Sequence, residues 1–146
     1  MPVTLRQFLL QKNYYRISLQ YTKTNHFAVE ASINHISGNF ILDTGASNSC
    51  IDLKVIEKFD LFAQESDIKA AGAGATDMIT QVSKRNTVDL GLWSRKNISL
   101  VLFDLTHVNT ALITHKADPV DGIIGADILK KGKAVIDYNR RCLYLK

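Results

Sequence analysis

The most informative stretch of the sequence is residues 40–47, which read Phe40-Ile41-Leu42-Asp43-Thr44-Gly45-Ala46-Ser47. Three consecutive apolar residues predict a short strand that is buried on both faces. A carboxylate follows this strand at once, and an ionised carboxylate beside core residues is costly unless its oxygens accept hydrogen bonds. Gly45 offers a backbone N–H that can approach the carboxylate without a Cβ in the way. Asp43 is therefore a candidate for a chemically tuned side chain.

The composition around this stretch predicts one soluble globular domain over residues 1–146. Of the 146 residues, 46% are hydrophobic and 22% are charged, and a chain of this length buries enough surface for a core without disulfides. The apolar run at residues 8–10 is much shorter than the core of a secretory signal. No run approaches the ~20 apolar residues of a membrane helix. We therefore expect a cytoplasmic protein without a membrane partner.

The basic residues do not predict a nucleic-acid partner. Net charge is +4, and the cations that lie closest together are Lys130, Lys131, Lys133, Arg140 and Arg141. No helix-turn-helix signature, finger spacing or aromatic RNA-binding pattern accompanies them. We interpret them as solvated turn residues and expect no nucleic acid to bind.

Beyond residues 40–47 the periodicity predicts strands and a few short helices. The predicted strands are residues 15–21, 27–33, 40–42, 49–51, 87–92, 98–105, 123–124, 134–136 and 142–145. The predicted helices are residues 5–14 with Thr4 as N-cap, 54–59, and 126–131 ending at Gly132. Turns are expected at 34–38 and 94–97, and a hairpin at 68–82 has its tip at 72–75. The chain is therefore predicted to be mainly β with two or three short helices.

A single carboxylate cannot supply both a general acid and a general base. The chain holds no second Asp-Thr-Gly, because neither Asp121 nor Asp127 is followed by Thr-Gly. A two-fold dimer would bring two Asp43 side chains together, and like charges about 3 Å apart share one proton. One carboxylate would then take a proton from water while the other donates to a carbonyl oxygen.

With these features the sequence resembles the retropepsin-like aspartic proteases, the dimeric relatives of pepsin, over roughly residues 27–146. The match rests on Asp43-Thr44-Gly45-Ala46 after an apolar strand, on a glycine-bearing hairpin with Gly72, Ala73 and Gly74, and on Ile123-Ile124-Gly125 before a short helix. The resemblance implies a closed or partly closed β-barrel. It makes 27–146 the motif-bearing core and 1–26 an N-terminal extension that the smallest viral members lack.

The resemblance also implies a role for each of these residues. Asp43 would be catalytic, Thr44 would bond the opposite subunit, and Gly45 and Ala46 would support the active site. Residues 72–74 would form the flap that covers a peptide or protein substrate, and residues 123–125 would pack against the catalytic loop. The implied activity is that of a homodimeric aspartic endopeptidase with no cofactor and no metal. Viral members interleave both chain termini at the dimer interface, and the extension at 1–26 would cap, replace or block that arrangement.

Other chemistries fit the sequence less well. Residues 45–49 come within one glycine of a serine-hydrolase motif, but the long α/β scaffold of those enzymes is absent. Residues 72–74 are not followed by the third glycine of a dinucleotide loop. The histidines and the two cysteines lack metal-ligand spacing, and we expect the thiols of Cys50 and Cys142 to be buried and free. The alternative to an enzyme is a catalytically inactive module of the same fold that dimerises or binds peptides.

Overall fold

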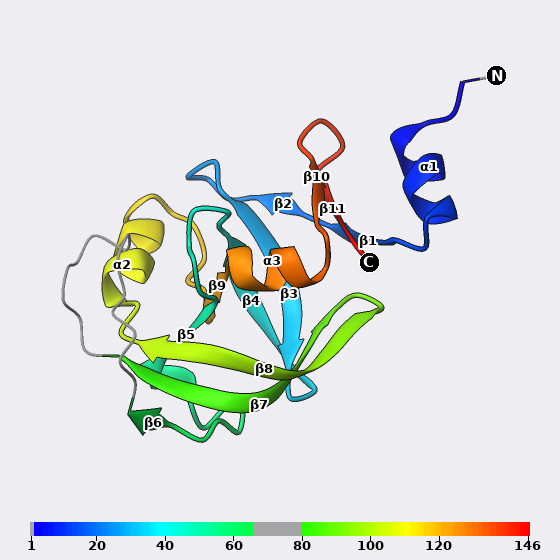
Figure 1. Cartoon of the computed structure of the whole chain (residues 1–146). Helices are drawn as coiled ribbons and strands as arrows, with labels where there is room; N and C mark the ends of the chain where they lie inside the picture. Colours follow the sequence, from blue (N-terminus) through cyan, green and yellow to red (C-terminus); the bar gives the residue numbers. More distant parts are fainter. Residues whose placement is uncertain (1, 66–79) are drawn as a thin grey trace.

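The computed structural model describes residues 2–65 and 80–146, which form a mainly β structure with short helices (Figure 1). The strands are β1 (Tyr15–Ser18), β2 (Gln20–Tyr21), β3 (Phe27–Ile33), β4 (Ile36–Leu42), β5 (Cys50–Asp52), β6 (Gln64–Glu65), β7 (Gln81–Leu90), β8 (Trp93–Phe103), β9 (Gly122–Ile124), β10 (Val135–Asp137) and β11 (Cys142–Leu145). The helices are α1 (Leu5–Gln11), α2 (Thr106–Thr114) and α3 (Ala126–Lys131), with a 3-10 turn η1 (Leu53–Val55). None of these helices is long and apolar enough to cross a membrane.

The larger sheet closes into a barrel. Its strand order is β2-β3-β4-β9-β5-β8-β7-β6, and β3 pairs in addition with β7. In that closing contact Ser32 lies opposite Asp89 and Ile33 opposite Val88. The ring β3-β4-β9-β5-β8-β7 is filled by apolar side chains, of which Trp93, Phe40 and Phe59 are the largest that are fully buried. The predicted fold class, a mainly β barrel with short helices, is confirmed.

A second, smaller sheet has the order β1-β11-β10. Its side chains alternate between two faces. Ile17, Leu143 and Leu145 join the barrel core, whereas Cys142 and Tyr144 pack against Leu9 of α1. Helix α1 lies beside this sheet at one end of the molecule (Figure 1). The segment 1–26 is thus joined to the rest of the chain by strand pairing, since β1 pairs with β11 and β2 with β3.

Strand β9 lies between β4 and β5. It runs parallel to β4, with Leu42 opposite Ile124, and antiparallel to β5, with Cys50 opposite Ile123. A Cβ at Gly122 would lie 2.2 Å from the Cys50 carbonyl oxygen, so glycine is needed where β9 passes β5. This arrangement brings the chain after residue 124 against the chain after residue 42.

Several local predictions are confirmed. Helix α1 begins after Thr4, whose side chain accepts from the Gln7 N–H while the Gln7 side chain accepts from the Thr4 N–H, which is a capping box. Helix α3 ends at Gly132 as expected. The C-terminal hairpin pairs β10 with β11, and both cysteines are buried and free.

The predicted helix at 54–59 is wrong. The structure has only the turn η1 there, with Asp52 as its N-cap, whose side chain accepts from the Lys54 N–H at 3.3 Å. Val55 and Ile56 are β-branched and disfavour a longer helix. Phe59 is fully buried in the barrel, so its packing determines the path of the chain.

The predicted turn at 94–97 is also wrong. Residues 94–97 belong to β8, and the chain reverses at Gly91 and Leu92, because Leu90 pairs with Trp93. Gly91 has φ +58, a conformation that suits glycine in a two-residue hairpin loop. The polar residues 94–97 are exposed because the β7–β8 hairpin extends beyond the barrel (Figure 1).

Helix α2 is not among the helices that the sequence predicts. Its residues include Thr, Val, Asn and Ile, which are poor helix formers. Leu112 is buried in a second apolar cluster with Leu105 and Val120. Tertiary packing therefore outweighs the weak local preference in this segment.

Candidate active site

Asp43 is the first residue after β4. Its backbone N–H donates to the Ile124 carbonyl at 2.9 Å, which continues the β4–β9 pairing by one residue. Phe40, Ile41 and Leu42 before it are buried, whereas Asp43 itself is exposed. The strand therefore holds the carboxylate at the end of a rigid element and presents it to solvent.

The turn after Asp43 is closed by backbone amides. Gly45 N–H donates to Asp43 Oδ1 at 2.9 Å, and Ala46 N–H donates to the Asp43 carbonyl at 3.2 Å. A Cβ on Gly45 would lie 3.3 Å from that Oδ1, so any larger residue would crowd the carboxylate. Among the described residues, no other group hydrogen-bonds the Asp43 carboxylate or the exposed Thr44 hydroxyl.

A second loop holds this turn in place. Ala126 N–H donates to the Ala46 carbonyl at 2.7 Å, and Gly125 N–H donates to Ser49 Oγ at 2.8 Å. A Cβ at Gly125 would lie 2.6 Å from the Ala46 carbonyl oxygen, so only glycine allows the two loops to approach this closely. The structure thus brings residues 43–46 and residues 123–125 together.

Ser49 and Asp127 complete this contact, although the sequence motifs predict a part in it for neither residue. Asp127 Oδ1 accepts from Ser49 Oγ at 2.7 Å and from Ser49 N–H at 2.9 Å. Asp127 lies in the first turn of α3, where a carboxylate is favoured by the helix dipole. The signal in the sequence is an acidic residue two positions after the Ile-Ile-Gly stretch, but the absence of Thr-Gly after Asp127 indicates only that it is not a second copy of the motif at Asp43.

The predicted flap residues Gly72, Ala73 and Gly74 lie outside the described part of the chain. The strands on either side of that segment are described. Gln64 pairs with Val82 and Glu65 with Gln81, so β6 and the start of β7 are antiparallel.

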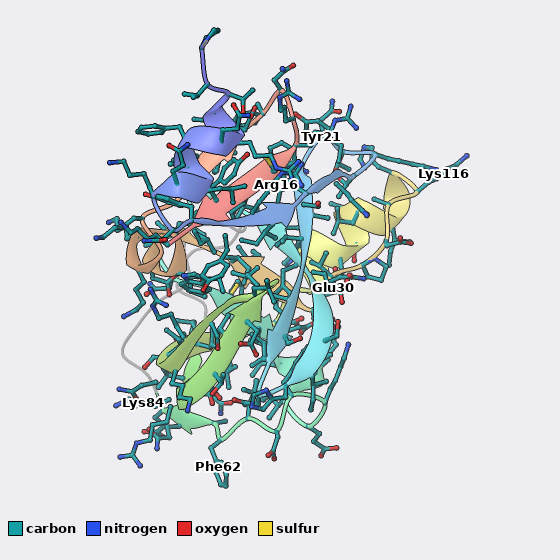
Figure 2. The ribbon with its side chains drawn as sticks, turned by 90° about the vertical axis from the view of Figure 1, so that its right-hand side faces the viewer. Arg16, Tyr21, Glu30, Phe62, Lys84 and Lys116 are labelled. Carbon is teal, nitrogen blue, oxygen red and sulfur yellow. The ribbon has the colours of Figure 1, made fainter. Side chains whose placement is uncertain are left out.

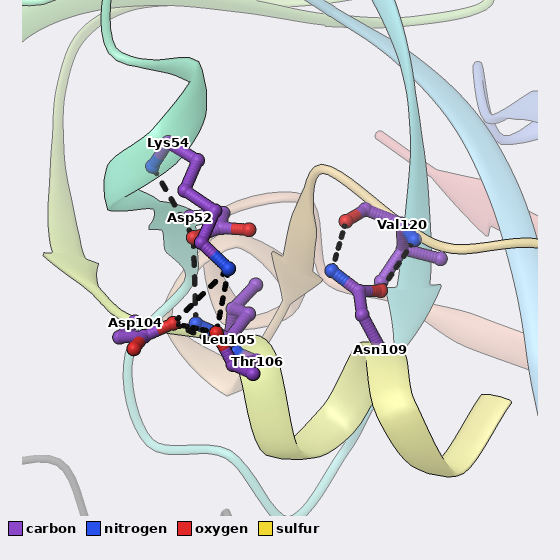
Figure 3. A network of polar contacts seen from close by, with 7 residues as sticks. All are labelled: Asp52, Lys54, Asp104, Leu105, Thr106, Asn109 and Val120. Carbon is purple, nitrogen blue, oxygen red and sulfur yellow. Dashed lines mark hydrogen bonds and ion pairs between the residues drawn. The ribbon is translucent and has the colours of Figure 1, made fainter. Parts of the chain in front are cut away.

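A polar network supports the candidate site from the side of β5 and α2 (Figure 3). Asp52 is 4% exposed and accepts from the N–H groups of Lys54 at 3.3 Å and Leu105 at 3.4 Å. Asn109 on α2 exchanges two hydrogen bonds with the Val120 backbone, at 3.0 and 2.7 Å. Val120 lies two residues before β9, so these contacts fix the entry of the strand that packs against residues 42 and 43.

The thiol behind the site is not a nucleophile. Burial raises the pKa of Cys50 to about 12, so the thiol stays protonated at neutral pH.

The four histidines are exposed. In the described residues no three His, Cys, Asp or Glu side chains gather in a way that would hold a metal ion. The chemistry that the arrangement offers is that of an exposed, oriented carboxylate.

Solved structures share this fold. A retropepsin-like aspartic protease from Rickettsia conorii matches with TM-score 0.56 and 22% identity over 90% of this chain and 89% of that one. EIAV protease in complex with an inhibitor matches with TM-score 0.56 and 19% identity over 77% of this chain and 92% of that one. The retroviral protease-like domain of Ddi1 from Leishmania major has TM-score 0.55 and 19% identity over 83% and 88%.

No curated protein sequence matches the chain significantly. The family described as aspartyl protease matches residues 29–128, which is more than half of the 146 residues. That range includes β4, the turn at Asp43 and the Ile-Ile-Gly stretch. The chain belongs to the aspartyl protease family and has the retropepsin-like fold.

Proposed function

We propose that the protein is an aspartic endopeptidase whose active site is formed by Asp43 from each of two chains. The observation that carries the proposal is the exposed Asp43 carboxylate, held at the end of buried β4 by the Gly45 N–H. The aspartyl protease family and the fold shared with proteases support this assignment. The substrate is a peptide or protein, and one dimer holds one active site.

In the proposed mechanism the two carboxylates share one proton because they lie close together. The ionised carboxylate takes a proton from a water molecule, which attacks the peptide carbonyl carbon. The protonated carboxyl donates to the carbonyl oxygen. Activity thus needs one proton on the pair, so we expect the rate to be highest on the acidic side of neutrality.

Residues 44–46 and 123–125 have supporting roles in this proposal. The Gly45 N–H orients the Asp43 carboxylate. The Thr44 hydroxyl has no hydrogen-bond partner among residues 2–65 and 80–146, and it would hydrogen-bond the second chain. Gly125 allows the loop that precedes α3 to pack against the Ala46 carbonyl. Residues 72–74 are proposed to cover the bound substrate.

The test is cleavage of a diverse peptide library by the wild type and by Asp43→Asn, at micromolar protein and several pH values. The amide keeps the shape of the side chain but cannot share the proton, so we expect the rate to fall on the order of 10³-fold. Asp60→Asn is the matched control, because Asp60 is exposed and has φ +55, a conformation that asparagine also adopts.

Cleavage that persists in Asp43→Asn would contradict the mechanism. If neither the wild type nor the control cleaves any peptide as a dimer, the chain is instead an inactive module that dimerises or binds peptides.

A further inference from the structure

We propose that a cleft between β1 and β3 binds an extended, cationic stretch of the polypeptide substrate, away from the bond that is cleaved. This stretch pairs with the open edge of β1 and places a lysine or arginine side chain against Glu30 and Asp89. The inference rests on the proposed function in one respect, because it takes the polypeptide to be a substrate of the Asp43 site. It adds a second contact region that selects substrates by sequence outside the cleavage site.

The cleft opens where β1 and β2 part. β2 pairs with β3 in the larger sheet, whereas β1 pairs with β11 in the smaller one. The change occurs at Leu19, whose N–H donates to the Arg141 carbonyl at 2.9 Å. On the β1 side of Leu19 the chain therefore leaves β3, and a cleft of about 400 Å³ lies between the two strands.

The two walls of the cleft belong to different sheets. Residues 16–18 of β1 form one wall, and residues 30–32 of β3 form the other together with Asp89 and Gly91. Figure 2 shows Arg16 on β1 and Glu30 on β3. In the described part of the chain β1 pairs with no strand other than β11. The second edge of β1 is thus open along the cleft.

The backbone of Glu30 is directed into the cleft. The loop 34–35 between β3 and β4 has two residues, both with positive φ, so the hydrogen-bonded pairs of this hairpin begin at Ile33. Because hydrogen bonding alternates along a strand, the even residues of β3 bond on the side away from β4. There Ala28 pairs with β2 and Ser32 with β7. Glu30, between them, has no strand partner on that side among residues 2–65 and 80–146.

The edge of β1 supplies the matching backbone groups on the other wall. The bond from Leu19 to Arg141 assigns the odd residues of β1 to β11, by the same alternation. Arg16 and Ser18 therefore direct their N–H and C=O groups into the cleft. An extended peptide satisfies such a row of groups by adding a strand to the sheet, and its side chains then determine specificity.

Two carboxylates on the β3 wall indicate which side chain fits. Glu30 and Ser32 lie on the same face of β3, and Asp89 lies opposite Ser32. Glu30 and Asp89 are thus diagonal neighbours, on the order of 7 Å apart, which long side chains can span. Glu30 Oε1 accepts from Ser37 Oγ at 2.8 Å, and its second oxygen is available to a ligand. One ammonium or guanidinium group can therefore contact both carboxylates.

The protein itself provides little positive charge for these two carboxylates. No lysine or arginine in the described ranges forms an ion pair with either of them. Asp89 has only the exposed ring of His35, whose Nδ1 lies 3.7 Å from Oδ2. The Arg16 guanidinium on the opposite wall donates to Ser18 Oγ at 3.4 Å. The β3 wall is thus complementary to a cationic side chain of a bound peptide.

The position of the cleft favours a substrate as its occupant. Phe27 of β3 lies opposite Leu42, the residue before Asp43, and Glu30 is three residues farther along β3. A strand rises about 3.3 Å per residue, so this separation is about 10 Å along the strand. A polypeptide cleaved at Asp43 therefore needs only a few additional extended residues to reach the cleft.

The test compares two substrates that share one cleavable core, chosen from the peptide library. One carries a Thr-Lys-Val-Lys-Thr tail and the other a Thr-Glu-Val-Glu-Thr tail, joined through a flexible Gly-Ser linker at either end of the core. We expect the wild type to show a KM about threefold to tenfold lower for the lysine tail. Binding away from the reacting bond leaves kcat unchanged. High salt should reduce the difference, because the contacts are partly exposed ion pairs.

The double variant Glu30→Gln with Asp89→Asn keeps the shapes of both side chains and removes their charges. We expect it to bring the ratio of the two KM values close to one. Glu57→Gln is the matched control, because Glu57 is exposed and does not line the cleft. This control keeps the KM ratio of the wild type and its rate on the core peptide without a tail.

Amide NMR on chains that carry Asp43→Asn measures binding without cleavage. The free lysine tail, acetylated and amidated, shifts the amide resonances of Arg16, Ser18 and Glu30, whereas the glutamate tail does not. N-methylation of alternate residues of the lysine tail gives two peptides, and strand pairing with β1 requires that at least one of them fails to bind. Retention of binding by both methylated peptides would contradict strand pairing in the cleft.

The outcomes separate this inference from the proposed function. Equal KM values for the two tails, or no shift of the three resonances, would overturn the inference, while normal cleavage of the core would leave the proposed function intact. Resonance shifts with the lysine tail in a protein whose wild type cleaves no peptide would overturn the proposed function and the assignment of the cleft to a substrate.

Discussion

Ser49 joins two loops that are 76 positions apart in the chain. Its hydroxyl accepts from the Gly125 N–H and donates to the Asp127 carboxylate, and its own N–H donates to the same carboxylate. Only 1% of Ser49 is exposed, so water cannot replace these partners. The turn that carries Asp43 therefore depends on one small buried side chain.

We expect Ser49→Ala to lower the free energy of unfolding by about 1–3 kcal/mol, because it leaves the buried Gly125 N–H without its acceptor. Urea denaturation of the variant measures the change. Ser47→Ala is the matched control. Ser47 is exposed and makes no hydrogen bond among the described residues, so we expect a change within about 0.5 kcal/mol. Equal stability of the two variants would show that the Ser49 hydroxyl does not hold the loops together.

At the scale of single elements, the start of α2 is held by a polar contact between Asp104 and Thr106, which we call the Asp104 anchor. The Asp104 carboxylate accepts from both the hydroxyl and the N–H of Thr106, and Lys54 Nζ lies 3.8 Å away. These interactions, the Thr106 hydroxyl first, lower the pKa of Asp104. Helix α2 also carries Asn109, which hydrogen-bonds the Val120 backbone just before β9. The contact between Asp104 and Thr106 is therefore connected to β9 through α2.

The pH dependence of this anchor follows from the direction of the shift. A lowered pKa means that the anchor contributes fully above the ordinary range of an aspartate and is lost as pH falls through the lowered value. We expect the Thr106 amide resonance to titrate with a midpoint below that of an ordinary aspartate. Thr106→Val should move the midpoint upward, since it removes the hydroxyl donor. A midpoint at or above the ordinary value in the wild type would contradict the assignment.

The elements differ in how well the sequence predicts them. Residues 40–42 and 142–145 were predicted correctly because their apolar periodicity matches their burial. Helix α2 and the reversal at Gly91 were missed, because the first depends on packing of Leu112 and the second on a glycine followed by an exposed leucine. Asp43 was found through its local context. Ser49 and Asp127 were not, since their importance arises from a contact 78 positions apart.

At the scale of the whole molecule, one chain supplies one Asp43, so the proposed activity requires two chains. We expect the specific activity to fall on dilution once the concentration drops below the dimer dissociation constant. Progress curves over a series of protein concentrations measure this, and an inert carrier protein excludes loss by adsorption. Constant specific activity in a preparation that sediments as a monomer would contradict the two-chain site.

The position of β9 between β4 and β5 also has a consequence for synthesis of the protein. In the described part of the chain, the turn at residues 43–46 obtains hydrogen-bond partners from outside itself only at Ile124 and Ala126. Such distant pairings form slowly because a long loop must close first. A ribosome-bound chain that ends before these residues has the aspartate and its own turn, but it lacks the partners that hold this turn against the barrel. The candidate site is therefore assembled late, after nearly all of the barrel has been translated.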